Sequence, residues 1–139
     1  MGACVVVDTN IVLDLLVFND PGAAVLQAAL REGRASWLAT APMREELSRV
    51  LAYPQIVPRL DFYGTTAGAV LAAFDAQARL VPVAPPAPWR CKDPDDQRFI
   101  DLAVAHRATL LSKDKAVICM RKRLLASGVA VCNATEFVA

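Results

Sequence analysis

Short apolar runs alternate with helix-forming segments along the chain. Residues Cys4 to Val7 are apolar at every position, which is typical of a strand buried on both faces of a parallel sheet. Four further runs predict strands: SWLAT (36–40), LVPVA (80–84), TLLSK (109–113) and VAVC (129–132). Pro82 interrupts the second of these runs, and we therefore expect that strand at an edge of the sheet.

The segments between the strands have helical periodicity and capping residues. In DPDDQRFIDLAVAHRA, Asp93 is a good cap, Pro94 suits the first turn, and Phe99, Ile100 and Ala103 form an inward stripe. The other predicted helices cover residues 9–18, 19–33, 42–52, 65–79 and 114–128. The order β-α-α-β-α-α-β-α-β-α-β predicts a three-layer α/β/α sandwich with a central, mainly parallel sheet.

Length and composition favour one folded domain over residues 1–139. A chain of this size can bury roughly two thirds of its unfolded surface, and 55% hydrophobic with 21% charged residues is typical of a globular protein. The apolar N-terminal stretch is interrupted by Asp8, Asn10 and Asp14 and has no basic flank. We therefore expect neither a signal peptide nor a membrane span, and a cytoplasmic location.

Cysteine, histidine and net charge exclude some classes of site. The four cysteines form no C-x-x-C pair, and His106 is the single histidine, so a zinc site is not expected. A net charge of +1 gives no general attraction to nucleic acid. The densest basic segment is SKDKAVICMRKRLLASG, which contains Lys113, Lys115, Arg121, Lys122 and Arg123.

Acidic residues follow the predicted strands at four places. Asp8 follows the first strand and Asp114 follows TLLSK. Glu45 and Glu46 lie in the first turns of the helix after SWLAT, and Asp93, Asp95 and Asp96 lie in the loop and first turn before TLLSK. Because ligands collect at the carboxyl ends of parallel strands, we expect these groups to converge on one rim. Helix capping explains several of them equally well, Asp8, Asp93 and Asp114 above all.

Carboxylates that converge raise one another's pKa unless a cation lies among them. Mg²⁺ or Mn²⁺ suits such a site, because hard divalent ions prefer oxygen ligands and keep bound waters. The chemistry expected from this arrangement is metal-assisted displacement at phosphorus. It requires neither a histidine nor a cysteine nucleophile.

The chain resembles PIN domains, most closely those that act as toxins of toxin-antitoxin systems, the VapC-like ribonucleases. The resemblance rests on VVVDTN, EELSRVL, DPDDQRFIDLA and ATLLSKDKAVI, which together span nearly the whole chain. It implies a metal-dependent endoribonuclease, a small antitoxin protein as partner and a homodimer.

The resemblance also implies the site residues. Asp8, Glu46, Asp96 and Asp114 would be the catalytic acids and metal ligands, with Glu46 preferred to Glu45 because it directly precedes Leu47. Asn10, Asp95 and Ser112 would support the site, and Ser112 replaces the more usual threonine but keeps the hydroxyl.

Several residues keep two interpretations. The possible RNA contacts are Arg44, Lys113, Lys115 and Arg121. Arg44 either contacts phosphate or pairs with Glu46, while Arg121 also suits the end of a helix.

Asp14 and Asp101 are expected on solvated faces. Trp37 and Trp89 are isolated, so they predict no base-stacking platform.

Two other functions compete with the ribonuclease. One is a PIN-fold RNA-binding or assembly module without activity, in which the acids serve only as caps. The other is a haloacid dehalogenase-like phosphatase, whose chains also begin with an apolar strand and D-x-D. Asn10 stands where that class has its second acid.

Overall fold

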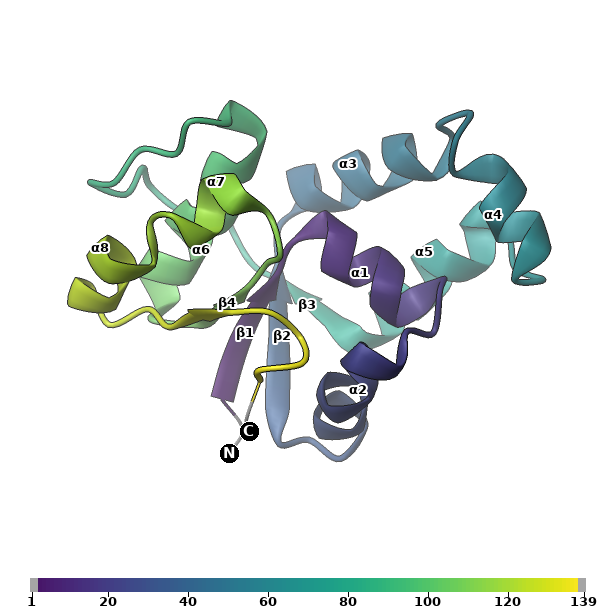
Figure 1. The fold of residues 1–139 in the computed structure, drawn as a ribbon, viewed down its shortest axis with the longest axis horizontal. Helices are drawn as coiled ribbons and strands as arrows, with labels where there is room; N and C mark the ends of the chain where they lie inside the picture. Colours follow the sequence, from purple (N-terminus) through teal and green to yellow (C-terminus); the bar gives the residue numbers. More distant parts are fainter. Residues whose placement is uncertain (1–2, 138–139) are drawn as a thin grey trace.

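The central sheet has five strands, all parallel. The computed structural model describes residues 3–137, and the strands are β1 (Ala3–Val7), β2 (Ala35–Ala39), β3 (Ala78–Leu80), β4 (Thr109–Leu111) and β5 (Val131–Cys132). Their order is β3-β2-β1-β4-β5 (Figure 1). Strand β1 is therefore central, with β2 on one side and β4 on the other. The parallel sheet that the sequence predicts is confirmed.

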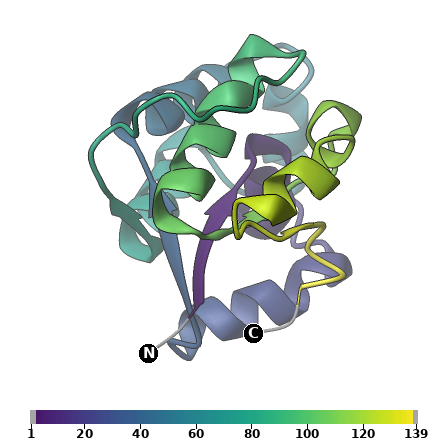
Figure 2. The ribbon, with the colours of Figure 1, turned by 90° about the vertical axis from the view of Figure 1, so that its left-hand side faces the viewer.

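Helices cover both faces of the sheet. The first group is α1 (Thr9–Leu16), the short 3₁₀ helix η1 (Pro21–Ala23), α2 (Ala24–Arg31), α3 (Ala41–Leu51), α4 (Val57–Phe62) and α5 (Ala67–Gln77). The second is α6 (Pro94–His106), α7 (Lys115–Ile118) and α8 (Arg121–Ala126). The chain moves outward from β1 to β3 and then returns to β4 and β5. Because such crossovers are right-handed, the two groups lie on opposite faces, and α6 and α8 lie in front of the strands in Figure 2.

The apolar runs form the core. Val5 and Val6 in β1 and Leu110 and Leu111 in β4 are completely buried. Trp37 of β2 is also buried and meets Phe74 of α5 edge to face, with ring centroids 5.0 Å apart. Continuous apolar strands are what a sheet covered on both faces requires.

Several predicted elements differ from the structure. The helix expected at 19–33 is η1 followed by α2, and the strand expected at 129–132 is β5, Val131–Cys132. The strand expected at 80–84 is β3, Ala78–Leu80, and it does lie at an edge of the sheet. The N–H of Val81 donates to the carbonyl of Ala39 at 2.8 Å, but Pro82 has no N–H to continue the pairing. The helix expected at 114–128 is divided into α7 and α8, and Met120 N–H bonds only three residues back, to Val117.

The sequence pattern predicts no element for residues 57–62, where α4 lies. Among the described residues, no single helix is both long and apolar enough to cross a membrane. The bent pair formed by residues 9–16 and 21–31 satisfies the length and composition requirement only when taken together.

Asp101 fastens the loop before α6 rather than facing solvent as expected. One of its carboxylate oxygens accepts hydrogen bonds from the N–H of Ala87 at 2.9 Å and from the amide of Gln97 at 2.8 Å. Gln97 in turn donates to the carbonyl of Trp89 and accepts from the N–H of Cys91. A half-buried side-chain network therefore holds the segment that leads into Asp93.

Replacing Asp101 with alanine leaves the donors of Ala87 and Gln97 without their acceptor. We expect Asp101→Ala to lower the free energy of unfolding by about 1–3 kcal/mol, measured by urea denaturation. Asp61→Ala removes an exposed carboxylate from α4 and is expected to change stability by less than about 0.5 kcal/mol. Equal stability of the two variants would contradict the proposed anchoring by Asp101.

Candidate metal centre

Asp8 lies at the point where the order of the sheet reverses. It directly follows β1, whose two neighbours are β2 and β4, and this is where open α/β sheets form their ligand crevice. It also caps α1, because Oδ1 accepts from the N–H of Asn10 at 3.2 Å. The side chain is only 4% exposed. Asp8 therefore both caps α1 and lies on the rim of the sheet, so the two interpretations of this residue are compatible.

Ser112 links the ends of β1 and β4. Its hydroxyl donates to Asp8 Oδ2 at 2.7 Å and accepts from the N–H of Asp114 at 3.1 Å. Asp114 caps α7 by accepting from the N–H of Ala116 at 2.9 Å. Ser112 is completely buried. One hydroxyl thus fixes the positions of two acidic residues from distant parts of the chain.

Asp96 completes a cluster of three acids. It lies in the first turn of α6, where Asp93 is the cap, and is 7% exposed. Oxygens of Asp8, Asp96 and Asp114 lie within 4.8 Å of one another. Asp96 Oδ2 is buried and has no hydrogen-bond partner among the described residues. A buried carboxylate oxygen without a hydrogen-bond donor destabilises the folded state. A positive group beside Asp96 Oδ2 would remove this penalty.

Burial and nearby acidic side chains favour the protonated forms of Asp8 and Asp96. Burial, with further contributions from the charges of Asp8 and Asp114, raises the pKa of Asp96 to about 8. The pKa of Asp8 is also raised, chiefly by burial, although its hydrogen bond from Ser112 opposes the shift. A bound cation would reverse this effect, because positive charge favours ionised carboxylates.

Glu46 lies in the same cleft but outside the cluster of three acids. The cleft has a volume of about 320 Å³, and its acidic lining residues are Asp8, Glu46, Asp93, Asp95, Asp96 and Asp114. No lysine, arginine or histidine contributes to its described lining. Glu46 extends from α3 and accepts a hydrogen bond from the hydroxyl of Thr9. Glu45 is exposed and does not line the cleft.

Thr9 is the residue that sequence reasoning missed. The sequence pattern indicates no role for it in the site, whereas its hydroxyl connects the start of α1 to Glu46. Asn10 contributes its main-chain N–H to Asp8 and lines the cleft. Asp95 also lines the cleft, and its N–H donates to the cap Asp93.

Three of the basic residues considered for RNA binding have acidic partners. Arg44 forms a two-pronged pair with Asp75, at 2.7 and 2.8 Å, and not with Glu46. Lys113 pairs with Asp14 at 2.7 Å, and Arg121 lies 3.5 Å from Glu136. Lys115 is exposed at the start of α7. Asp14 is therefore buried beside a lysine, contrary to the solvated position expected for it.

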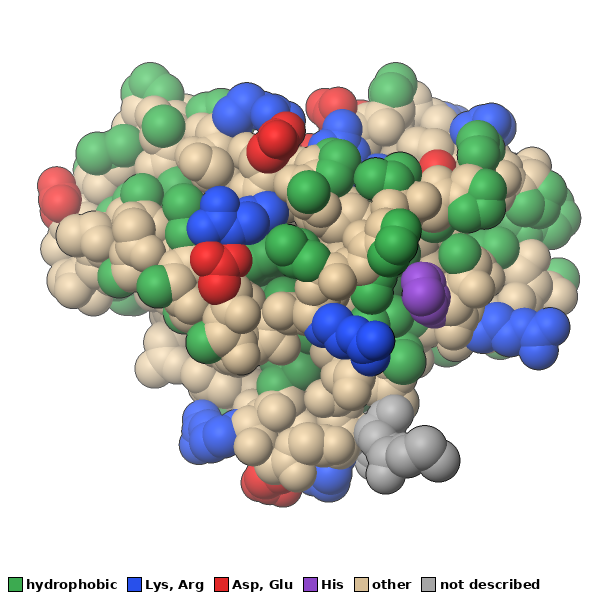
Figure 3. All heavy atoms as spheres, turned by 180° about the vertical axis from the view of Figure 1, so that it is seen from behind, with side chains coloured by type: hydrophobic (Ala, Val, Ile, Leu, Met, Phe, Trp, Pro, Cys, Tyr) green, Lys and Arg blue, Asp and Glu red, His purple; other side chains and the backbone are tan. Residues whose placement is uncertain are grey.

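The rear face of the molecule has mixed charge (Figure 3). On the face in Figure 3, lysine and arginine side chains are dispersed among acidic ones. His106 is exposed at the carboxyl end of α6, the end opposite Asp96. It therefore lies outside the candidate site.

The donor set fits a hard divalent cation. Three carboxylates, one directly after β1, one in the first turn of α6 and one after β4, offer oxygen ligands, which Mg²⁺ and Mn²⁺ prefer. The oxygen of Asp96 that lacks a partner provides independent support, because a cation would satisfy it. Fold and site together define an α/β/α domain with an acidic cleft at the switch point of its sheet.

The family model described as PIN domain matches residues 4–116. The chain therefore belongs to the PIN domain family, whose members are generally nucleases and typically depend on a divalent metal ion. The matched residues include Asp8, Glu46, Asp96 and Asp114. No curated protein matches the chain in a sequence comparison.

The raised pKa of Asp96 predicts how stability depends on pH in the absence of metal. An aspartate titrates near 3.9 in an unfolded chain and Asp96 near 8 in the folded protein, so folding takes up a proton between these values. This contribution favours the folded state most strongly below the unfolded pKa and is lost as pH rises through about 8.

Asp96→Asn imitates the neutral acid at every pH. We therefore expect the unfolding free energy of the wild type, minus that of Asp96→Asn, to fall steadily as pH rises toward 8. Urea denaturation of both proteins with a chelator present measures this difference. A difference that is independent of pH would show that Asp96 is not perturbed.

Proposed function

We propose that this protein is a metal-dependent endoribonuclease that hydrolyses RNA phosphodiester bonds, and that it is the toxin of a type II toxin-antitoxin pair. The observation that carries the proposal is the group of three clustered acids with one buried oxygen left without a partner. Membership of a family of nucleases supports the reaction class. The choice of RNA and the toxin role come from the resemblance of VVVDTN, EELSRVL and DPDDQRFIDLA to that subgroup.

Asp8, Asp96 and Asp114 would hold Mg²⁺ or Mn²⁺. When bound, such an ion supplies positive charge for a phosphate oxygen and lowers the pKa of water. Ser112 keeps the carboxylate of Asp8 in place and, through the N–H of Asp114, the start of α7. The protein thus holds its acids in one arrangement before substrate binds, which limits the reorganisation required for reaction.

Glu46 is suited to move a proton. Its carboxylate lines the same cleft as the three acids, is half-buried and is held by the Thr9 hydroxyl. A carboxylate placed in this way can accept a proton from a water molecule in the cleft. This role gives Glu46 a function in the cleft although it does not belong to the cluster of three acids.

The acidic cleft also determines how an inhibitor would act. Its described lining contains six acids and no basic side chain, so an inserted arginine or lysine would pair with the carboxylates and compete with the metal. We propose that a small antitoxin protein blocks the site in this way. A homodimer of this chain remains part of the proposal.

Cleavage of RNA tests the proposed activity. We expect purified protein to cut an end-labelled RNA mixture with Mn²⁺ or Mg²⁺ and not with a chelator. Because loss of groups that only support metal ligands costs about 10–100-fold in activity, Asp96→Asn should lose more than about 100-fold. Gel analysis of fragments over time measures the rates.

The adjacent glutamates provide a matched control. Glu46→Gln should lose at least about 10-fold in rate, whereas Glu45→Gln, one residue away and outside the cleft, should cut like the wild type. If the wild type binds metal but neither it nor any of the variants cuts RNA, a binding module without activity would be favoured. Cleavage of small phosphomonoesters would instead favour the phosphatase, which family membership leaves without support.

A further inference from the structure

A second groove lies along α1 beyond the acidic cleft. Its lining includes Asp14, Phe18, Asp20, Arg59, Tyr63 and Lys113, and we call it the aromatic groove. It adjoins the acidic cleft through two elements. Helix α1 begins beside Asp8 and leads to Phe18, and Lys113 immediately precedes Asp114.

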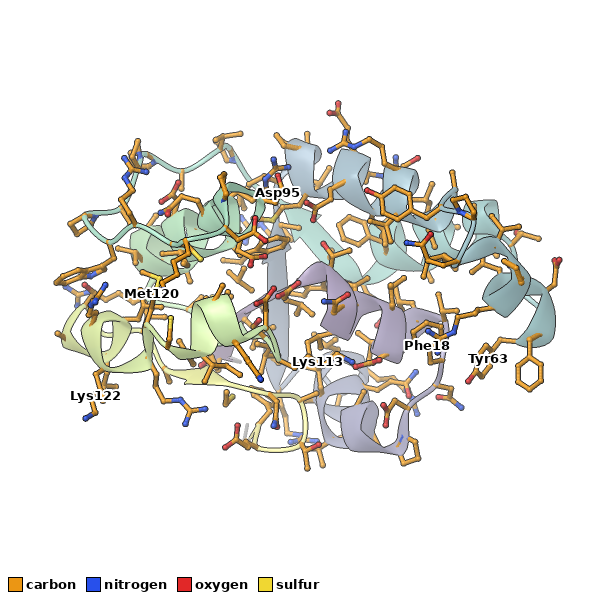
Figure 4. All side chains as sticks on the ribbon, turned by 45° about the horizontal axis from the view of Figure 1, so that its top comes forward. Phe18, Tyr63, Asp95, Lys113, Met120 and Lys122 are labelled. Atoms are coloured by element: carbon orange, nitrogen blue, oxygen red, sulfur yellow. The ribbon has the colours of Figure 1, made fainter. Side chains whose placement is uncertain are left out.

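Flat side chains form one wall of this groove. The rings of Phe18 and Tyr63 lie 5.5 Å apart at an angle of 48°, and the guanidinium carbon of Arg59 lies 3.8 Å from the centre of the Phe18 ring. Tyr63 is 43% exposed. Figure 4 shows Phe18 and Tyr63 beside each other, with Lys113 nearer the start of α1. Aromatic rings and guanidinium planes are the surfaces on which bases of single strands stack.

The charges of the groove suit a base better than a phosphate. Lys113 is paired with Asp14 at 2.7 Å, and Asp20 adds a second carboxylate that accepts from the N–H of Gly22. Two acids therefore balance the two basic residues of the lining, Arg59 and Lys113. Ionised carboxylates only accept hydrogen bonds, so they match amino groups on base edges and repel phosphate.

We propose that the aromatic groove binds one base of a single-stranded RNA whose backbone crosses the acidic cleft, and that it prefers bases with an exocyclic amino group. The inference rests on the proposed ribonuclease function and adds a substrate subsite to it. From Asp8 to Phe18 the helical rise is roughly 15 Å, a span that a few nucleotides of an extended strand can cover.

The stacking platform uses residues that the sequence did not indicate. Trp37 is in the core and Trp89 donates from its ring nitrogen to Ser127, so neither takes part. Phe18 follows α1, whereas Tyr63 follows α4, the helix with no sequence signal. Only the fold brings them together.

Tyr63→Ala tests the subsite. The variant is made in the Asp96→Asn protein so that bound RNA is not cut, and affinity for a short, unstructured, fluorescein-labelled RNA containing all four bases is measured by anisotropy. Loss of one stacked base predicts binding weaker by about 5- to 150-fold. Tyr63→Phe keeps the ring and should keep the affinity. Phe62→Ala removes the 82% exposed ring of the last residue of α4, which does not line the groove. Because this ring only meets the edge of the Tyr63 ring, at 5.1 Å between centroids, its loss should weaken binding much less than Tyr63→Ala.

Abasic substitution along the RNA shows whether Tyr63 contacts a base. At one position, removing the base should weaken binding to the parent but have no further effect in Tyr63→Ala, because both changes remove the same contact. With the four bases exchanged at that position, uracil should bind most weakly. Failure of Tyr63→Ala to weaken binding, an equal loss in Phe62→Ala, or no coupling at any position would overturn the subsite.

Cleavage by the protein with Asp96 intact is measured separately, so the two proposals can fail independently. RNA cleavage without coupling to Tyr63 would remove the base subsite and leave the ribonuclease. Coupling without cleavage would support the base subsite and remove the ribonuclease. An Asp96→Asn parent that binds no RNA would overturn the subsite.

Discussion

Repulsion among three clustered carboxylates, two of them buried and one half-buried, is the constraint on which this structure depends. Asp8, Asp96 and Asp114 are held within 4.8 Å of one another, and the pKa of Asp96 rises to about 8 because burial and its acidic neighbours disfavour its charge. Such an arrangement weakens a fold near neutral pH unless a proton or a cation occupies it. We propose that this cost favours the binding of a divalent ion, because a cation among the carboxylates would remove their repulsion.

The topology explains why the acids converge despite their distance along the chain. Strand β1 is the point where the sheet reverses its order, so the loop after β1, the start of α6 and the loop after β4 meet at one edge. Ser112 then restricts the movement of two of these acids, because its hydroxyl donates to the carboxylate of Asp8 and accepts from the N–H of Asp114. The network of Asp101 and Gln97 holds the segment before α6. Rigid supports of this kind let the site keep like charges close together.

The sequence predicted the fold well because apolar strands and capped helices are local signals. It also placed Asp8, Asp96 and Asp114 on one rim, since each follows or precedes a recognisable strand. It could not show that Asp96 has an oxygen without a partner, that Thr9 holds Glu46, or that Asp101 anchors a loop, because these are contacts between distant segments. Residues 57–62 lacked a clear helical pattern, so the sequence did not predict α4. Because Arg59 of α4 and Tyr63 directly after it line the aromatic groove, the sequence did not indicate that groove either.

Calorimetric titration of Mn²⁺ into the metal-free protein, near neutral pH and in two buffers of different ionisation enthalpy, tests the central claim most directly. Because Asp96 has a pKa of about 8 and must ionise to bind a metal, we predict the release of about one proton for each ion bound. The released proton should disappear in Asp96→Asn, with much weaker binding. Tight binding without proton release, or equal binding by Asp96→Asn, would contradict a metal centre built on these three acids.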